Sequence, residues 1–186
     1  LEQLIPQLAQ TLKDLGVDKN TYFHISDEPN DKQLASYKTA KEIVGDLLRD
    51  FPVLDALSHF DFYEKGLTQV PVPAIDCIEP FLKNRPDEMW TYYCCGQMNK
   101  VTNRFFSMPS ARNRIAGVQF YKYEIDGFLQ WGYNFYNSQL SRRRINPFMV
   151  TDADMAFPSG DSYSVYPGED GPLLSLRAEV FADGLR

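Results

Sequence analysis

Short apolar segments with strand character alternate with helical segments over residues 1–133, and this alternation limits the fold more than any other feature. Apolar residues recur at helical spacing over about 4–15 and 31–51, and a third helix is expected over about 110–123, with Ser110 as its N-cap candidate. Such alternation is typical of parallel sheets, in which each helix crosses from one strand to the next. Five strands are predicted, over residues 21–26, 53–59, 72–77, 88–94 and 127–133.

The predicted fold class is α/β, and specifically the C-terminal part of a (β/α)8 TIM barrel made of about five β/α units. A complete barrel takes about 250 residues, whereas this chain has 186. The chain starts at Leu1 inside a helical pattern and stops soon after Gly184, so both ends are expected to be cut. An open five-stranded sheet is the alternative. We expect a single domain fragment, with an irregular segment rich in proline and glycine over 134–186.

Composition and charge exclude several classes of protein. A net charge of −6 argues against nucleic acid as a partner, because phosphates require a basic surface. No apolar run approaches the ~20 residues that span a bilayer. Cys77, Cys94 and Cys95 show neither a disulfide pattern nor zinc spacing, and no metal or cofactor is expected. The aromatic share of 14% fits either a carbohydrate site, since sugar C–H faces pack on rings, or a Tyr- and Phe-rich core.

The segment Tyr22-Phe23-His24-Ile25-Ser26-Asp27-Glu28-Pro29 says most about function. A β-prone run stops at two adjacent carboxylates, and in α/β proteins binding crevices open at strand ends. Successive side chains of a strand point to opposite faces, so Asp27 and Glu28 serve one pocket only if the chain leaves the pleat. Pro29 favours such a break, because it lacks an N–H and restricts Glu28. Alternatively, Asp27, Glu28 or Asp31 caps the following helix.

Two carboxyl groups of this kind can share the work of breaking a glycosidic bond. Adjacent residues fit poorly with the usual scheme, in which the groups flank the scissile bond at ~5–10 Å. They fit better with substrate assistance, in which the sugar's own 2-acetamido oxygen attacks the anomeric carbon. One carboxylate then orients the acetamido N–H, and the other gives a proton to the leaving oxygen.

Four motifs occur in one order along the chain: His24-Ile25-Ser26-Asp27-Glu28-Pro29, Trp90-Thr91-Tyr92-Tyr93-Cys94, Asp126-Gly127-Phe128-Leu129-Gln130-Trp131, and Tyr166-Pro167-Gly168 with Ser175-Leu176-Arg177-Ala178-Glu179. Together they resemble the catalytic domain of glycoside hydrolase family 123, from about residue 20 to the end. The resemblance implies a (β/α)8 barrel and β-N-acetylgalactosaminidase activity by substrate assistance. It also implies that Asp27 holds and polarises the acetamido group, while Glu28 acts as general acid and then as base for water.

Further candidate sugar contacts lie near strand ends. Trp131 could form the floor of a sugar subsite, or could be a core tryptophan. Tyr92 and Tyr93 alternate in direction, so one of them is expected to face the site, where its hydroxyl would bond the acetamido carbonyl. The remaining candidate contacts are His59, Asp76 and Trp90.

Other polar residues have structural interpretations, and two further functions stay open. His24 is expected to be a buried structural hydrogen-bonding residue, and Arg177 and Glu179 to share one face of an extended segment, where they could form a structural ion pair. One alternative function is a glycosidase of other specificity, which pairs Asp27 or Glu28 with a second carboxylate such as Asp76. The other is a non-catalytic carbohydrate-binding module.

Overall fold

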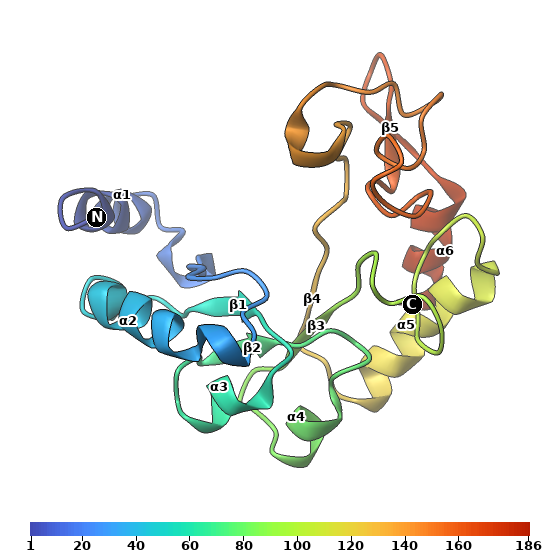
Figure 1. Cartoon of the computed structure of the whole chain (residues 1–186). Coiled ribbons are helices and arrows are strands. Elements are labelled where there is room, and N and C mark those ends of the chain that lie inside the picture. The colour runs from blue at the N-terminus through green and yellow to red at the C-terminus, as the bar shows by residue number, and fades with distance from the viewer. The chain divides into compact units, whose positions relative to one another are not determined.

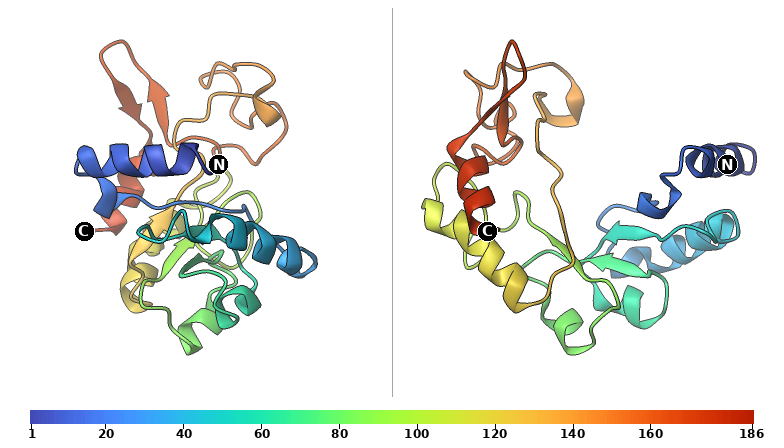
Figure 2. Two further views of the ribbon diagram at one scale, coloured as in Figure 1. Left: turned by 90° about the vertical axis from the view of Figure 1, so that its left-hand side faces the viewer. Right: turned by 180° about the vertical axis from the view of Figure 1, so that it is seen from behind.

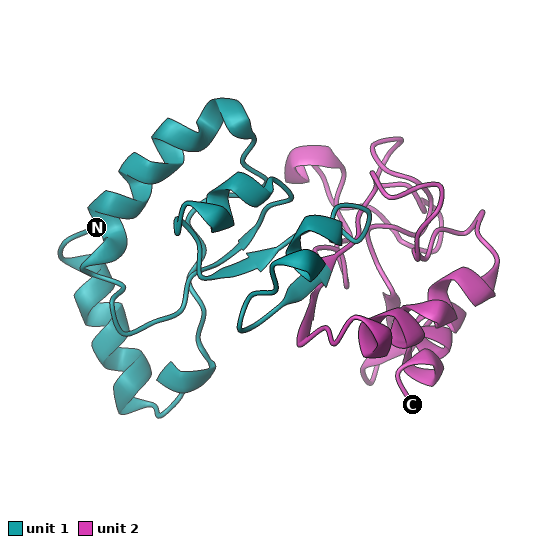
Figure 3. Ribbon diagram, turned by 90° about the horizontal axis from the view of Figure 1, so that it is seen from below, with its two compact units in different colours: residues 1–91 teal, residues 92–186 magenta.

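The computed structural model describes residues 1–186 and shows a mixed α/β fold (Figure 1). The chain divides into two compact units, residues 1–91 and 92–186 (Figure 3). Each sheet has two strands. The α/β class predicted from the sequence is therefore confirmed, whereas the barrel is not seen in this chain.

The first unit begins with a helix and then alternates short strands with helices (Figure 1). Its elements are α1 (Leu4–Asp14), the 3-10 turns η1 (Asp18–Asn20) and η2 (Asp31–Gln33), α2 (Leu34–Gly45), β1 (Leu54–Ala56), α3 (Phe60–Glu64), β2 (Val70–Val72) and α4 (Glu79–Lys83), and β3 (Trp90–Tyr92) leads to the second unit.

Three neighbouring segments of the first unit run parallel. Phe23 forms one parallel bridge with Val53, and β1 pairs with β2 in parallel, with Asp55 opposite Pro71. The helix α2 lies in the connection before β1, and α3 lies between β1 and β2. Parallel neighbours need such crossovers, so these segments form consecutive β/α units. The predicted strand over 72–77 was placed too late, because β2 ends at Val72 and only a single bridge at Ala74 precedes the turn that follows.

The helix after Pro29 starts with a reciprocal cap that the sequence analysis did not assign. The Asn30 side chain accepts a hydrogen bond from the Lys32 N–H at 3.0 Å, and the Asn30 N–H donates to Gln33 Oε1 at 3.0 Å. This capping box satisfies donors that have no partner within the helix. The alternative in which Asp27, Glu28 or Asp31 serves as the cap is therefore wrong.

Aromatic side chains form much of the core of the first unit. Tyr37 of α2 meets Phe62 of α3 edge to face at 5.1 Å, and Phe60 meets Phe81 of α4 in the same way at 5.1 Å. Phe62 and Phe81 are fully buried. These rings pack the helices of the first unit against one another. The residues of β1 and β2 are all buried, as is usual for parallel strands covered on both faces.

The second unit combines two packed helices with an antiparallel hairpin and long irregular stretches. Its elements after β3 are α5 (Ser110–Lys122), β4 (Gly127–Leu129), the 3-10 turn η3 (Gln139–Ser141), β5 (Val165–Pro167), β6 (Pro172–Leu174) and α6 (Leu176–Gly184). The views of Figure 2 show α5 and α6 side by side.

Three sequence expectations about the second unit are corrected. The stretch over 134–186 was expected to be irregular, but it ends in the hairpin β5–β6 and the helix α6. Arg177 and Glu179 therefore lie on a helix and not on an extended segment. The Ser175 hydroxyl caps this helix, accepting from the Ala178 N–H at 3.2 Å. The helix α5 begins at Ser110 without a side-chain cap, so Ser110 is not its N-cap.

Helices α5 and α6 approach closely because each has a glycine at the contact. A Cβ atom at Gly117 would overlap the Gly184 carbonyl, and one at Gly184 would overlap the Arg114 carbonyl. The Arg114 Nε also donates to Asp183 at 2.6 Å. None of the helices in either unit combines the length and apolar character that a membrane span requires.

We expect Gly117→Ala to lower the free energy of unfolding by about 1–3 kcal/mol, because the added methyl group forces two packed helix backbones apart. Denaturant unfolding measures this change. Gly45→Ala, near the end of α2, is the matched control, since nothing lies within 4 Å of a Cβ there. Replacing a helical glycine by alanine should leave stability equal or higher by about 0.5–1 kcal/mol. Equal losses in both variants would contradict the close packing.

Candidate active site

Loops that follow three parallel segments of the first unit are joined by short hydrogen bonds. The Glu28 N–H donates to the Ala56 carbonyl at 2.8 Å, which ties the first loop to the end of β1. His59 Nδ1 lies 2.7 Å from Asp31 Oδ1. The Ala74 N–H donates to Ser58 Oγ at 3.0 Å, which joins the loop after β1 to the loop after β2. The carboxyl ends of these segments therefore form one continuous edge, where α/β proteins place their sites.

The strand that leads to Asp27 leaves its regular pairing after one bridge. The Phe23 N–H donates to the Pro52 carbonyl, and the Leu54 N–H donates to the Phe23 carbonyl. In a regular ladder the Asp27 N–H would next reach the Ala56 carbonyl, but the Glu28 N–H does so instead. The first segment thus contains one residue more than the ladder allows, as in a β-bulge, and bulges beside active sites re-aim side chains.

Asp27 and Glu28 are both exposed at this break. Glu28 has φ of +43°, a region that residues other than glycine rarely occupy, and Pro29 after it is buried. Strained residues of this kind cluster at active sites, where the surrounding structure holds them in place. Because the extra residue interrupts the alternation of the strand, the rule that sends successive side chains to opposite faces does not apply to this pair.

A buried carboxylate holds the backbone just before the pair. Asp55, in the middle of β1, is fully buried, and its Oδ1 accepts from the Ile25 N–H at 2.7 Å and the Ser26 N–H at 3.0 Å. Its Oδ2 accepts from the Tyr37 hydroxyl. Burial and the hydrogen bond to Asp55 raise the pKa of Tyr37, so this hydroxyl stays protonated as a donor.

His24 is half-exposed and not buried as expected, but it makes the predicted kind of structural contact. Its Nδ1 lies 3.0 Å from the Leu54 carbonyl and 2.9 Å from Asp55 Oδ1. Both partners are acceptors, so Nδ1 carries the proton. The histidine thus supplies the hydrogen bond that the Leu54 carbonyl would accept from Ile25 in a regular ladder.

Two other candidates lie on the same edge. His59 directly precedes α3 and pairs with Asp31, with 44% of its side chain exposed. Asp76 is exposed in the turn after β2. Burial, first, and the neighbouring Asp76 carboxylate raise the pKa of Cys77, so this thiol is held in its protonated form.

Trp90 lies at the amino end of β3 and not on the carboxyl edge that carries the acidic pair. Its Nε1 donates to Glu88 Oε1 at 2.8 Å, the same oxygen that accepts from the Tyr22 hydroxyl at 2.6 Å, and its ring lies 5.5 Å from that of Tyr22. Tyr22 and Trp90 stand at the amino ends of their strands, whereas Asp27 and Glu28 follow a carboxyl end. The structure therefore does not bring Trp90 together with the acidic pair.

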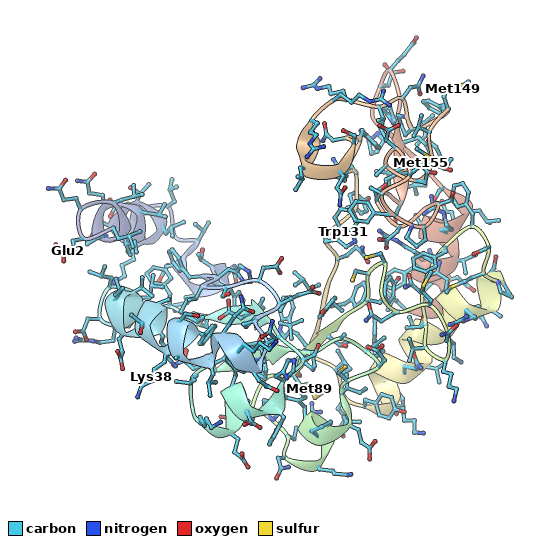
Figure 4. The ribbon with its side chains drawn as sticks, in the orientation of Figure 1. Glu2, Lys38, Met89, Trp131, Met149 and Met155 are labelled. Carbon is cyan, nitrogen blue, oxygen red and sulfur yellow. The ribbon has the colours of Figure 1, made fainter.

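Tyr92, Tyr93 and Trp131 lie in the second unit. Both tyrosines are buried, Tyr93 almost completely, and its ring lies 4.8 Å from Phe128. Burial raises the pKa of Tyr93 to about 12, so its hydroxyl remains a donor. Trp131, labelled in Figure 4, is 40% exposed and packs one side against Phe157 at 4.8 Å, so it is not an enclosed core tryptophan.

A cavity of about 270 Å³ lies inside the second unit, and two arginines line it. Arg104 is buried and donates to the Asp161 carbonyl at 2.7 Å and to Ser164 Oγ. Burial lowers the pKa of Arg104 to about 10, which leaves it charged at neutral pH. Arg177 donates to the Tyr163 carbonyl at 2.6 Å and lies over the Phe106 ring at 4.7 Å. The further lining residues include Tyr93, Phe128 and Gln130.

Sequence reasoning missed two residues of this framework. Asp55 was a recognisable signal, because a charged residue in the apolar run 53–57 must find buried partners. Arg104 had no such signal, since it lies in an irregular stretch outside every predicted element. No cluster of three or more His, Cys, Asp or Glu side chains is arranged to hold a metal ion.

The sequence was compared with models of known protein families. The family model for the catalytic domain of glycoside hydrolase 123 matches residues 1–186. The class of protein that this match defines is the catalytic domain of a glycoside hydrolase. The chain belongs to glycoside hydrolase family 123.

A solved structure of a family 123 glycoside hydrolase from Clostridium perfringens, studied for the details of glycolipid glycan hydrolysis, resembles the chain. The TM-score is 0.72 at 16% sequence identity, over 99% of this chain and 33% of that one. The likeness shows the fold, and the chain spans about a third of the length of this relative. No curated protein matches the sequence.

Asp161 should make stability depend on pH. Burial raises the pKa of this fully buried carboxyl from 3.8 to about 6, although Arg104 and the Trp131 indole oppose the shift. A raised pKa means that the folded state favours the protonated carboxyl of Asp161. The folded protein is therefore most stable, with respect to this group, below about pH 4, and it loses stability as pH rises through 6. We expect a loss of about 2–3 kcal/mol between pH 4 and pH 7 from this group.

The test measures the free energy of unfolding by denaturant for the wild type and for Asp161→Asn between pH 4 and pH 7. The difference between the two proteins at each pH gives the contribution of Asp161. The variant cannot titrate at this position, so it should gain stability relative to the wild type as pH rises. Parallel stability curves for the two proteins would show that Asp161 is not perturbed in this way.

Proposed function

We propose that the protein is a retaining glycoside hydrolase that releases a terminal β-linked N-acetylhexosamine by substrate assistance, with GalNAc favoured over GlcNAc. The observation that carries this proposal is the exposed Asp27–Glu28 pair at a backbone break on the carboxyl edge of neighbouring parallel segments. Membership of family 123 supports glycosidic bond cleavage as its chemistry.

The fold that we propose for the intact protein is a (β/α)8 barrel, of which the first unit supplies consecutive β/α units. The parallel order of Phe23, β1 and β2, each followed by helical structure, supports this arrangement. In a barrel the loops after these strands surround the active site. That placement would put Asp27, Glu28, His59 and Asp76 around one opening.

The two carboxylates receive different roles. Asp27 orients the acetamido N–H and stabilises the positive charge that develops as the acetamido oxygen attacks the anomeric carbon. Glu28 protonates the leaving oxygen and afterwards takes a proton from the attacking water. Adjacent residues suit this division because the substrate itself supplies the nucleophile, so the two groups need not flank the bond from opposite sides.

Other candidates keep narrower roles. His59, held by Asp31, and Asp76 are proposed to contact sugar hydroxyls from the edge that carries the acidic pair. Trp131 of the second unit remains a predicted sugar contact, because its half-exposed indole offers a face to a pyranose ring. One of Tyr92 and Tyr93 also remains a predicted contact, although both side chains are buried. Since the solved relative was studied with glycolipid glycans, a glycolipid that ends in β-GalNAc is a reasonable first natural substrate to test.

Glu28→Gln should lower turnover of an aryl β-N-acetylgalactosaminide by about 10²–10⁴-fold, because the amide cannot donate the proton that the leaving group needs. The assay is steady-state release of the phenol by the intact protein. Glu42→Gln on α2 is the matched control, since Glu42 is exposed and only pairs with Lys38 at 3.9 Å. Full turnover in Glu28→Gln would exclude it as the acid.

A pair of substrates separates the proposal from a glycosidase of other specificity. If the acetamido group is the nucleophile, an aryl β-galactoside that lacks it should be hydrolysed at a small fraction of the rate of the acetamido sugar. Equal rates on both sugars, together with loss of activity in Asp76→Asn, would favour the second-carboxylate mechanism. Binding of the sugars without any hydrolysis would favour a carbohydrate-binding module.

A further inference from the structure

Just before the acidic pair, the buried carboxylate of Asp55 accepts backbone hydrogen bonds that a neighbouring strand would otherwise accept. Its Oδ1 accepts from two successive backbone N–H groups, those of Ile25 and Ser26. In an extended strand successive N–H groups point in opposite directions, so one acceptor cannot reach both. Convergence on one oxygen shows that the backbone has already turned at these residues, in the manner of an anion-binding nest.

The second oxygen of Asp55 is held from another element. The Tyr37 hydroxyl on α2 donates to Oδ2, and both residues are buried. The helix α2 is the one that follows the break in the chain, so the turn is attached at both of its sides: to β1 through Asp55 and to α2 through Tyr37. His24 Nδ1 completes the arrangement at 2.9 Å from Oδ1.

We propose that Asp55 is a positioning residue for the acid–base chemistry of Glu28. Its side chain is fully buried and faces Tyr37, His24 and the backbone of residues 25 and 26, so it acts by fixing the direction in which the chain leaves the strand. The next residues in the chain are Asp27 and Glu28, so a change in the turn moves their carboxylates directly. This inference rests on the proposed glycosidase function.

An aspartate has the required chemistry because both of its oxygens are acceptors and each faces only donors. Asparagine has nearly the same shape, but its NH₂ group would face a donor on one side or the other. The charge also matters, since hydrogen bonds to a buried carboxylate are stronger than those to an amide. Asp55→Asn should therefore loosen the turn without changing the volume of the core.

The test compares two aryl N-acetyl-β-galactosaminides that differ in the leaving group, assayed with the intact protein. Phenolate is a poor leaving group and needs protonation by Glu28, whereas 2,4-dinitrophenolate departs with little help. A misplaced acid therefore slows the phenyl substrate most. For Asp55→Asn we expect kcat/KM on the phenyl substrate to fall by about 10²-fold. The loss on the dinitrophenyl substrate should be at least about tenfold smaller.

A purely structural role predicts a different result, because a smaller folded fraction lowers the rates on both substrates equally. Val72→Ala, at a buried position of β2, is the matched control for such a loss. Equal losses on the two substrates in Asp55→Asn would overturn the proposal. Should that variant not fold, Tyr37→Phe, which removes only the donor to Oδ2, decides in the same way: a selective loss supports the proposal and an equal loss overturns it.

Failure of the proposed function gives a separate signature. If the wild-type protein hydrolyses neither substrate, the glycosidase assignment is wrong, and the positioning role falls with it. If the wild type is active and only the selectivity of the loss is missing, the function stands and the role of Asp55 is wrong. The wild-type rate therefore distinguishes the two failures before any variant is compared.

Discussion

Removing a carboxylate from water is unfavourable unless hydrogen bonds replace its hydration, and in the first unit this requirement falls on Asp55. Its two oxygens receive two backbone N–H groups, a tyrosine hydroxyl and a histidine N–H. These donors come from the segment before the acidic pair and from α2. Satisfying one buried charge thus joins a strand, a turn and a helix, and the turn carries Asp27 and Glu28.

A comparable arrangement organises the second unit around two arginines, of which Arg104 is buried and Arg177 partly buried. Arg104 reaches carbonyl groups of residues 132 and 161 as well as Ser164, and Arg177 reaches carbonyls of residues 160 and 163. Long stretches of this unit have no ladder of their own, so side-chain donors satisfy backbone acceptors that a sheet would otherwise satisfy. Both units therefore use charged side chains in place of main-chain pairing where regular structure ends.

Local patterns predicted a large part of the secondary structure. Helical spacing identified α1 and α5 almost to their ends, because each has an unbroken periodic run. The strands over 53–59, 88–94 and 127–133 were found but drawn too long, since pairing and not composition ends a strand. The predicted strand over 21–26 is reduced to one bridge at Phe23, and the one over 72–77 overlaps β2 only at Val72. The helix α6 was missed because the prolines and glycines at 167–172 suggested irregular chain throughout. Ser175 followed by Leu176-Arg177-Ala178-Glu179 was its unused start signal.

The sequence by itself determined the acidic pair, the proline after it and the β-prone segment before it, because these are neighbours in the chain and their backbone preferences are local. It also placed a lone aspartate in the apolar run of β1. Only the tertiary structure decided what that aspartate binds, since its backbone partners lie 30 and 29 residues away and its tyrosine 18 residues away. Local patterns carry no information about which distant donor reaches a buried acceptor. Pro29 favours a break locally, but the contacts of Asp55 decide how the backbone turns before Asp27 and Glu28.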